Sequence, residues 1–463
     1  MAIQIYNSLS RKKEEFAPLN PPDLNIYTCG VTVYDDCHIG HARSLYTFDV
    51  IRRYLRYRGF KVNFVRNITD IDDKIINRAN ELKTNWQELV KKYIESYYQD
   101  LKTLGIEKAD FEPRATENIA DMIRYIKGLI DKGYAYVTES GVYFNVRKFS
   151  GYGKLSGQSV DEMLTGVRKG SDEAKEDPLD FALWKSSKEG EPFWESPWGN
   201  GRPGWHIECS VMSQKYLKTD TLDIHAGGRD LIFPHHENEL TQAQALTGKP
   251  FAKYWIHHGL LTINSQKMSK SLGNFVTIKD FTAKYNNADL LKLFFLSAHY
   301  SHPVDYTDEK IGEAKQALER IMILLDKMEK MSFPPKLKNP PFPELEEIKS
   351  KFIKAMDDDF NTPQALASVF ELVNLANKNI DDLDFSSGAY KLFFELAGIF
   401  GLEFKKAAAG QSLDSEIEAL IDKRDGARKR KDFAESDRLR KELEARGIIL
   451  EDTKDGTAWR RKL

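Results

Sequence analysis

The N-terminal part of the chain alternates between the hydrophobic spacing of strands and that of a helix. A short apolar run over residues 24–29 ends at Gly30 and predicts a strand, and alternation over residues 61–68 predicts a second one. Between them, residues 41–58 carry apolar side chains at nearly helical spacing, at Ala42, Leu45, Phe48, Ile51 and Leu55. A strand, a helix and a strand in this order form a βαβ unit, which favours a parallel sheet of the Rossmann type.

The rest of the chain divides by composition and pattern. Residues 86–104 and 116–132 have helical patterns, whereas residues 138–200 are rich in Gly, Ser and Lys. We interpret this stretch as an insertion between two halves of the sheet domain, because strand signals resume after it. Residues 316–405 are mostly helical in pattern, and a short alanine-rich linker separates them from residues 411–463.

Composition is that of a soluble globular protein, with 41% hydrophobic and 30% charged residues and a mean hydropathy of -0.52. We expect neither a membrane partner nor export, because no apolar run of about 18 or more residues and no secretory signal occur. The three cysteines, Cys29, Cys37 and Cys209, are too few for a disulfide framework. They indicate the reducing cytoplasm, where a cysteine with a function is a ligand or a nucleophile.

Charge is unevenly distributed, although the net charge of the whole chain is only -2. Residues 423–463 contain 14 basic and 9 acidic residues, so this tail carries a net charge of +5. A basic C-terminal module on an acidic body is consistent with a polyanionic partner. A solvated, charged helix face is the alternative.

Two histidines lie at the start of the predicted helix, in the segment His38-Ile39-Gly40-His41. A helix N-terminus presents unpaired N–H groups and a partial positive charge, which favour a phosphate. Imidazole donors there can stabilise a phosphate whose charge grows in a transition state, and Gly40 allows a flat base to approach the backbone. Histidines in this place can equally be structural.

A second segment, Lys267-Met268-Ser269-Lys270-Ser271, follows an apolar run and lies in a stretch that contains Ser and Gly. We expect a mobile loop here, on which two lysines could neutralise a triphosphate and the leaving pyrophosphate. A solvated loop without function is the alternative, because lysine is mostly exposed in any protein.

These two segments match letter for letter the signature sequences of class I aminoacyl-tRNA synthetases, in the expected order and on either side of an insertion. The resemblance implies a Rossmann catalytic domain that activates an amino acid with ATP and Mg²⁺ and transfers it to tRNA. It also implies that His38 and His41 stabilise the α-phosphate in the transition state. Lys267 and Lys270 are the expected catalytic lysines, and the expected ATP-binding residues are Gly40, His41 and Lys270.

Four further residues form a candidate metal-ligand set. His235 and Glu239 are four residues apart after Pro234, so a helix would place them on the same side. Cys29 ends the first predicted strand, at the mouth of the sheet, and Cys209 follows the insertion. Two thiolates, an imidazole and a carboxylate are typical zinc ligands. Because their spacing is so long, the alternative is that the cysteines are small buried hydrophobic residues.

The segments around these residues resemble those of cysteinyl-tRNA synthetase, at Tyr27–Asp35, Gly204–Ser210 and Phe233–Glu239. The resemblance implies one Zn²⁺ that binds the thiolate of the substrate L-cysteine and is held by Cys29, Cys209, His235 and Glu239. A thiol with a pKa of about 8.5 is readily deprotonated on the metal whereas an alcohol is not, so zinc can reject serine without an editing domain. Val31 departs from the family, which commonly has proline there.

Three residues are predicted to contact the substrate. Thr69 follows the second strand, Trp205 is expected to close over bound cysteine, and Asp230 is expected to pair with the substrate ammonium. The alternatives are a core position for the tryptophan and a helix cap for the aspartate. We expect neither Cys37 nor His236 to be a metal ligand. The cysteine precedes the first signature histidine, and the histidine points about 100° away from its neighbour on a regular helix.

The C-terminal part resembles the regions of the same family that contact tRNA. Residues 357–363 resemble the start of a helical-bundle domain, and their acidic run also fits a helix N-terminus. Residues 428–461 resemble the module that reads the anticodon. We expect Arg428, Asp452 and Trp459 to bind tRNA(Cys), because such side chains stack on or pair with splayed bases.

The predicted α/β fold is a Rossmann-type parallel-sheet catalytic domain with an insertion, followed by a helical bundle and a small anticodon-binding module. We expect a monomer. The predicted parts are residues 1–137 and 201–255 for the two halves of the catalytic domain, 138–200 for the inserted connective domain, 256–315 for the region of the second signature, which contacts the tRNA stem, 316–405 for the bundle, and 411–463 for the module.

Two other functions are alternatives to the formation of cysteinyl-tRNA, AMP and pyrophosphate. A related ligase activates cysteine and joins it to an amino sugar, but such relatives lack the anticodon module. A non-catalytic RNA-binding descendant of a synthetase is expected to have decayed signatures, whereas both are intact here. The sequence therefore favours a cysteine-activating tRNA ligase.

Overall fold

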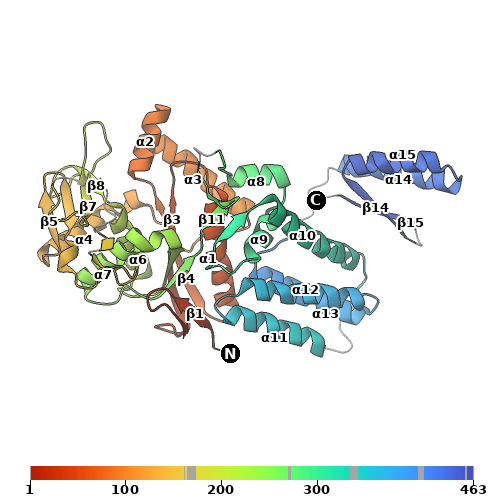
Figure 1. The fold of residues 1–463 in the computed structure, drawn as a ribbon, viewed down its shortest axis with the longest axis horizontal. Coiled ribbons are helices and arrows are strands. Elements are labelled where there is room, and N and C mark those ends of the chain that lie inside the picture. Colours follow the sequence, from red (N-terminus) through yellow and green to blue (C-terminus); the bar gives the residue numbers. More distant parts are fainter. Residues whose placement is uncertain are drawn as a thin grey trace.

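A parallel sheet lies at the centre of the computed structural model, and its described strands follow the order β10-β9-β3-β4 (Figure 1). They span Ala252–His258 (β10), Leu222–Gly228 (β9), Asp23–Thr32 (β3) and Lys61–Thr69 (β4). Each neighbouring pair is parallel. The structure describes residues 2–160, 162–163, 174–269, 273–333, 342–404, 411–453 and 456–461.

Helix α1 (Ile39–Tyr57) connects β3 to β4, and this confirms the predicted βαβ unit. The strand order reverses at β3, because β4 lies on one side of it and β9 lies on the other. Every residue of β9 is buried, as expected for a parallel sheet that is covered on both faces. In sheets of this kind the ligand lies beyond the carboxyl ends of the strands, at the point of reversal.

The inserted region forms an antiparallel sheet of its own, drawn in yellow at the left of Figure 1. Its described strands are β5 (Ala135–Thr138), β6 (Gly141–Phe144), β7 (Phe181–Ser186) and β8 (Gly201–Pro203). Helix α4 (Ile119–Asp131) precedes this sheet and helix α6 (Trp205–Leu217) follows it. Its buried residues form a hydrophobic cluster with both helices, so the insertion packs on the main domain through α4 and α6.

The remaining elements of the sheet domain surround these two sheets. They are β1 (Gln4–Asn7), β2 (Lys12–Glu15), α2 (Asp73–Leu82), α3 (Trp86–Thr103), α7 (Glu237–Thr247), β11 (Leu261–Ile263), β12 (Gln266–Lys267) and β13 (Val304–Tyr306). Strand β11 pairs with β12 and with β13, and β12 contains the first lysine of the second signature.

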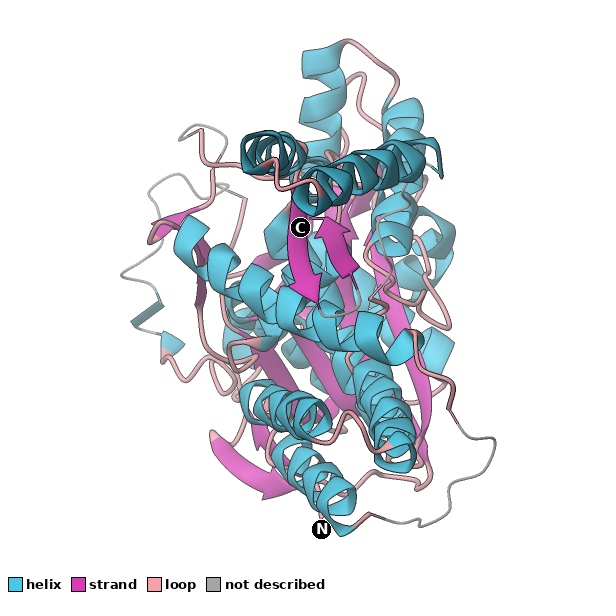
Figure 2. Cartoon of the chain, turned by 90° about the vertical axis from the view of Figure 1, so that its right-hand side faces the viewer, coloured by secondary structure: helices cyan, strands magenta, loops and turns pink. Residues whose placement is uncertain are grey.

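Helices make up the C-terminal part of the chain (Figures 1 and 2). They are α8 (Ile278–Tyr285), α9 (Ala288–Leu296), α10 (Asp308–Glu329), α11 (Pro343–Asp357), α12 (Thr362–Lys378) and α13 (Leu383–Ile399). The last module contains α14 (Gln411–Lys429), α15 (Phe433–Ala445) and the hairpin of β14 (Ile448–Thr453) and β15 (Gly456–Arg461). Together with the sheets, these helices confirm the predicted fold class.

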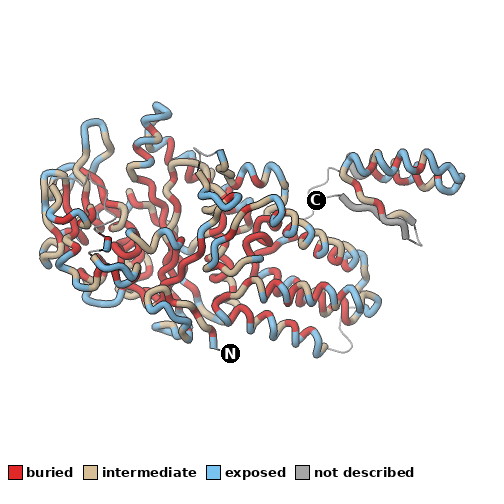
Figure 3. The backbone as a smooth tube through the Cα atoms, in the orientation of Figure 1, coloured by how far each residue is buried: buried red, intermediate tan, exposed pale blue. Residues whose placement is uncertain are grey.

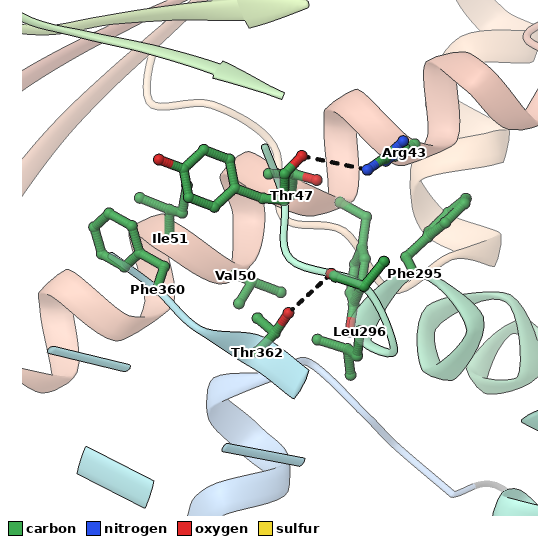
Figure 4. A pocket seen from close by; sticks show the side chains of 11 residues that line it. Arg43, Thr47, Val50, Ile51, Phe295, Leu296, Phe360 and Thr362 are labelled. Carbon is green, nitrogen blue, oxygen red and sulfur yellow. Dashed lines mark hydrogen bonds between the residues drawn. The ribbon is translucent and has the colours of Figure 1, made fainter. Parts of the chain in front are cut away.

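Helix α1 joins the sheet to the bundle. Buried residues run from the sheet through this helix into the bundle (Figure 3). Tyr46 Oη donates to the carbonyl oxygen of Phe400 at 2.7 Å, and Tyr54 Oη donates to Asp357 Oδ1 at 2.6 Å. A cavity of about 20 Å³ lies at this joint, and Figure 4 shows side chains that line it, among them Val50 of α1 and Phe360 and Thr362. The two hydrogen bonds and the shared hydrophobic core join α1 to the bundle.

Asp100 on α3 is a buried carboxyl group whose Oδ2 atom has no hydrogen-bond partner among the described residues. Burial raises the pKa of Asp100 to about 7, and the nearby Lys279 opposes the shift. Between about pH 4 and pH 7 the folded chain thus holds a proton that the unfolded chain has lost. The contribution of Asp100 to stability is therefore present at low pH and is lost as the pH rises through about 7.

The substitution Asp100→Asn replaces the ionisable carboxyl group by a neutral amide. At pH 8 we expect the variant to have a melting temperature roughly 1–4 °C above that of the unmodified chain. At pH 5, only about one pH unit above the ordinary pKa of Asp, the difference should be clearly smaller than at pH 8. Scanning calorimetry at both pH values measures this, and an equal shift at pH 5 and pH 8 would show that ionisation of Asp100 is not the cause.

Candidate active site and metal centre

A bulge in β3 presents Cys29 at the carboxyl edge of the sheet. The pairing of β3 with β4 shifts register between Thr28 and Val31. The Gly30 N–H donates to Asn67 Oδ1 at 2.8 Å, and a Cβ atom at position 30 would lie 1.6 Å from the Asn67 carbonyl oxygen. Only glycine fits this close approach, so the residue after Cys29 fixes the bulge.

Four buried or half-buried side chains from three distant segments meet beside this bulge, and their ligand atoms all lie within 4.8 Å of one another: Cys29, Cys209, His235 and Glu239. The two Sγ atoms are 3.8 Å apart, Cys209 Sγ is 3.6 Å from His235 Nε2, and Cys29 Sγ is 3.5 Å from Glu239 Oε1. Tetrahedral zinc with ordinary bond lengths separates two sulfurs by about 3.8 Å, and sulfur from nitrogen or oxygen by about 3.6 Å. The donor set and these three separations therefore fit a zinc ion.

A second set of ligand atoms among the described residues shares Cys29 and Glu239 and adds His225 and His236. His225 Nε2 lies 2.6 Å from Glu239 Oε2, and His236 Nε2 lies 3.2 Å from Cys29 Sγ. Both are hydrogen-bond distances, shorter than those across a metal ion, whereas only one of the separations cited for the first set is so short, His235 Nε2 to Glu239 Oε1 at 2.6 Å. The first set fits a metal better, and these two histidines are placed to orient Glu239 and Cys29.

The charges of the cluster favour a protonated His235 beside an ionised Glu239. Although burial opposes its charged form, Glu239 and Cys209 raise the pKa of His235 to about 10. Burial likewise opposes ionisation of Glu239, but His235 and His225 lower its pKa well below the ordinary value. The His235 Nε2 to Glu239 Oε1 distance of 2.6 Å is that of a charged hydrogen bond. A metal must displace this proton, so metal affinity is expected to fall as the pH falls.

The structure corrects the reason given for setting His236 apart from the cluster. The angle of about 100° holds for a regular α-helix, whereas residues Ile232–His236 form a wider π-helical turn in which Phe233 is not helical. His236 Nε2 lies 3.2 Å from Cys29 Sγ, so this side chain also reaches the cluster. Cys37 lies in neither of the two ligand sets.

Thr69 participates in a buried hydrogen-bond network next to the cluster. Its Oγ1 atom donates to Glu208 Oε2 at 2.8 Å and accepts from Asn67 Nδ2 at 3.2 Å. Burial, and then the neighbouring Cys209, raise the pKa of Glu208 well above its ordinary value. Sequence reasoning missed Glu208, and it gave no role to Asn67. Their positions were a signal, because one precedes a candidate ligand and the other lies near the carboxyl end of β4.

The two other predicted substrate contacts also lie at this edge. Trp205, the first residue of α6, stacks on the ring of His235 with 4.0 Å between ring centroids. Asp230 is exposed in the 3-10 turn Arg229–Leu231, directly after β9. The roles of Thr69, Trp205 and Asp230 in substrate binding stay predictions.

His38 and His41 cap the N-terminus of α1 for each other. His38 Nδ1 accepts from the His41 N–H at 3.2 Å, and His41 Nδ1 accepts from the His38 N–H at 3.3 Å. The two rings stack with 3.7 Å between centroids. Because Nδ1 is the acceptor, these bonds assign the hydrogen of each neutral ring to Nε2. Burial, and then His38, lower the pKa of His41 well below its ordinary value, so its Nε2–H group is a neutral donor.

The first signature is hydrogen-bonded to the segment that follows the second. The Ile39 N–H donates to the Val276 carbonyl oxygen at 3.1 Å, and the Ile278 N–H donates to that of Cys37 at 2.9 Å. Gly40 faces Met268, since a Cβ at position 40 would lie 3.3 Å from its Cε atom. The exposed Lys267 ends β12, whereas Lys270 lies outside the described residues.

The predicted tRNA-binding residues lie in the last module. Arg428 is exposed in the last turn of α14. Asp452 belongs to β14 and Trp459 to β15, and their side chains are outside the described part of the chain. Their roles stay predictions. No described helix has the length and apolar character needed to cross a membrane.

Solved structures of other synthetases share this fold. Methionyl-tRNA synthetase of Mycobacterium tuberculosis, in complex with methionyl-adenylate, has a TM-score of 0.58 at 16% identity, over 82% of this chain and 90% of that one. LeuRS of Agrobacterium radiobacter K84, in a ternary complex with tRNA, has a TM-score of 0.62 at 12% identity, over 83% and 85%. The family described as tRNA synthetases class I (C) catalytic domain matches residues 15–316. The shared fold and the family match together identify the chain as a class I aminoacyl-tRNA synthetase.

Matches outside the catalytic domain show which family of class I synthetases the chain belongs to. A DALR domain matches residues 351–405, and a cysteinyl-tRNA ligase anticodon binding domain matches residues 411–460. Proteins named cysteine--tRNA ligase from Geobacillus thermodenitrificans and Anoxybacillus flavithermus are each 50% identical, over 99% and 100% of both chains respectively. The chain belongs to the cysteine--tRNA ligase family, which confirms the resemblance seen in the sequence, and it is an aminoacyl-tRNA ligase.

Cobalt(II) tests the metal centre, because its thiolate bonds absorb light. We expect metal-free protein to bind one Co²⁺ per chain with a thiolate-to-cobalt charge-transfer band. Cys209→Ser should lower this band to about half and weaken binding by about 10-fold or more, since one of two thiolate ligands is lost.

Cys37→Ser is the matched control, because Cys37 is buried but belongs to neither ligand set. This variant should keep the band and the affinity of the unmodified chain. A band that survives Cys209→Ser unchanged would contradict the assigned ligands.

Proposed function

We propose that the protein activates L-cysteine with ATP and transfers it to the 3′ end of tRNA(Cys), with a zinc ion selecting cysteine. The observation that carries this proposal is the buried cluster of two cysteines, one histidine and one glutamate at the carboxyl edge of the sheet. Its position at the point where the strand order reverses is where such a sheet binds its ligand. The names of the relatives that are 50% identical support cysteine as the substrate.

The residues at the start of α1 supply the ATP chemistry. An α-phosphate against this helix N-terminus would meet the helix dipole and the Nε2–H donors of His38 and His41. Mutual capping holds both rings in place before ATP binds, so little reorganisation is needed when charge develops on the phosphate. We assign the neutralisation of the leaving pyrophosphate to Lys267 and Lys270, together with Mg²⁺ brought by ATP.

Selection against serine is the task of the cluster. An apolar pocket separates cysteine from serine only weakly, because the two differ by one atom. When bound, zinc favours a thiolate over an alcohol as its ligand. The protein's own part is to hold the ligands. His225 and His236 bond to Glu239 and Cys29, and Trp205 covers one face of His235.

The last module supports tRNA as the acceptor. It has its own hydrophobic cluster, built from α14, α15 and β14, and its α14–α15 turn exposes Arg428–Lys431. Basic side chains on a separate module suit a nucleic-acid backbone. A cysteine-activating ligase with a different acceptor would have no use for this module.

The reaction is tested by ATP–pyrophosphate exchange on the full chain with zinc. We expect L-cysteine to support exchange, and L-serine at the same concentration to be slower by about 10⁴-fold or more, as for other sites that bond directly to the distinguishing group. Equal rates would contradict selection by zinc. The absence of exchange with cysteine would contradict the proposed activation step.

Truncation after Phe404 separates activation from transfer. The end of the bundle keeps its anchor, because Asp289 Oδ2 accepts the Phe404 N–H at 2.6 Å and Lys292 Nζ donates to the Gly401 carbonyl at 2.7 Å. We expect exchange to stay within about twofold, and aminoacylation to fall by roughly 10- to 100-fold through lost base stacking. Unchanged aminoacylation would remove the case for the module as a tRNA contact.

A further inference from the structure

Three elements meet at the carboxylate of Asp36, two residues before the first signature histidine. Asp36 Oδ1 accepts from Ser96 Oγ of α3 at 2.5 Å and from Lys279 Nζ of α8 at 2.6 Å. None of these residues belongs to either signature. Helix α8 follows the second signature, so Asp36 links the loop before α1 to the element that ends the lysine-bearing segment.

The link between Asp36 and Lys279 extends a short antiparallel pairing. His38 pairs with Thr277, and the backbone bonds on either side join Ile39 to Val276 and Ile278 to Cys37. In the same register the next opposed residues are Asp36 and Lys279. The backbone ladder stops there because α8 begins at Ile278, with Thr277 and Asp280 forming its capping box. A side-chain ion pair takes the place of the next backbone bonds.

The ion pair favours the charged forms of both Asp36 and Lys279. Although burial opposes ionisation, the bonds from Lys279 and Ser96 lower the pKa of Asp36, and the bond from Asp36 raises that of Lys279. The side chains are 30% and 50% exposed, and an ion pair so exposed adds little to overall stability. Its effect is therefore expected in local geometry rather than in the melting temperature.

Local geometry matters here because both signatures act on one nucleotide. The His38 ring packs edge-on against Phe275 with 5.3 Å between centroids, so a shift of residues 275–279 displaces a phosphate donor. We propose that Asp36 is a positioning residue for adenylate formation, which holds α8 and the segment before it in register with His38. This inference rests on the proposed function, since it concerns the same reaction.

The test compares Asp36→Asn, Lys279→Met, the double variant, and the charge-reversed pair Asp36→Lys with Lys279→Asp. The measurements are kcat and KM in cysteine-dependent ATP–pyrophosphate exchange, and the melting temperature. We expect each single variant to lower kcat/KM for ATP by about three- to tenfold, because a small misplacement of reacting groups is costly. The KM for cysteine and the melting temperature should stay nearly constant.

Two comparisons separate positioning from a general loss of surface charge. The double variant should lose no more than either single variant, and charge reversal should restore kcat/KM for ATP to within about twofold of the unmodified chain. Asp220→Asn is the matched control, because Asp220 pairs with Lys249 at 2.7 Å and at similar exposure, on elements that contain neither signature. It should change nothing.

Unchanged kcat/KM for ATP in both single variants would overturn the inference, as would losses that simply add and are not restored by charge reversal. A fall in melting temperature that parallels the loss of activity would also overturn it, in favour of a structural role. No exchange by the unmodified chain would instead overturn the proposed function.

Discussion

The side chains at the centre of the molecule are arranged around the carboxylate of Glu239, which is fully buried away from water. A fully buried charge must be paired, and here His225 and His235 bond to its two oxygen atoms. His236 then bonds to Cys29, and its other nitrogen bonds to His257. The concentration of imidazole rings around the cluster follows from this need, because histidine is a short side chain that can donate at one nitrogen and accept at the other.

The fold was largely predictable because its strongest signals are local. The hydrophobic spacing around α1, the bulge glycine and the two signatures each lie within one short segment. Local spacing pairs His235 with Glu239, but their combination with Cys29 and Cys209 gained weight only from a resemblance, since the two cysteines are 180 residues apart. Of the partners of Thr69, Asn67 lies two residues away on the same strand, whereas nothing local shows that Glu208 joins the network. That His236 also reaches Cys29 could not be predicted from helix geometry, because the π-helical turn with its kink at Phe233 has no signal in the sequence.

Helix α1 explains how distant parts of the chain act together. Its first turn carries the mutual cap of His38 and His41, and its later turns bond to Phe400 and Asp357 in the bundle. A helix is stiff along its axis, so displacement of the bundle is transmitted to the imidazole donors. The same helix is covered by the sheet, the bundle and the segment after the second signature. These contacts leave it little freedom to adjust independently.

The pairing of β3 with β9 affects how the chain folds while it is being synthesised. Strand β3 leaves the ribosome before its neighbour β9, which is made only after the whole insertion. Until then one edge of β3 is unpaired, and Cys29 has no Cys209 beside it. Non-local pairing of this kind folds slowly, because a long loop must close first. The nascent chain therefore passes through a period in which an aggregation-prone strand edge is exposed and no complete metal centre exists.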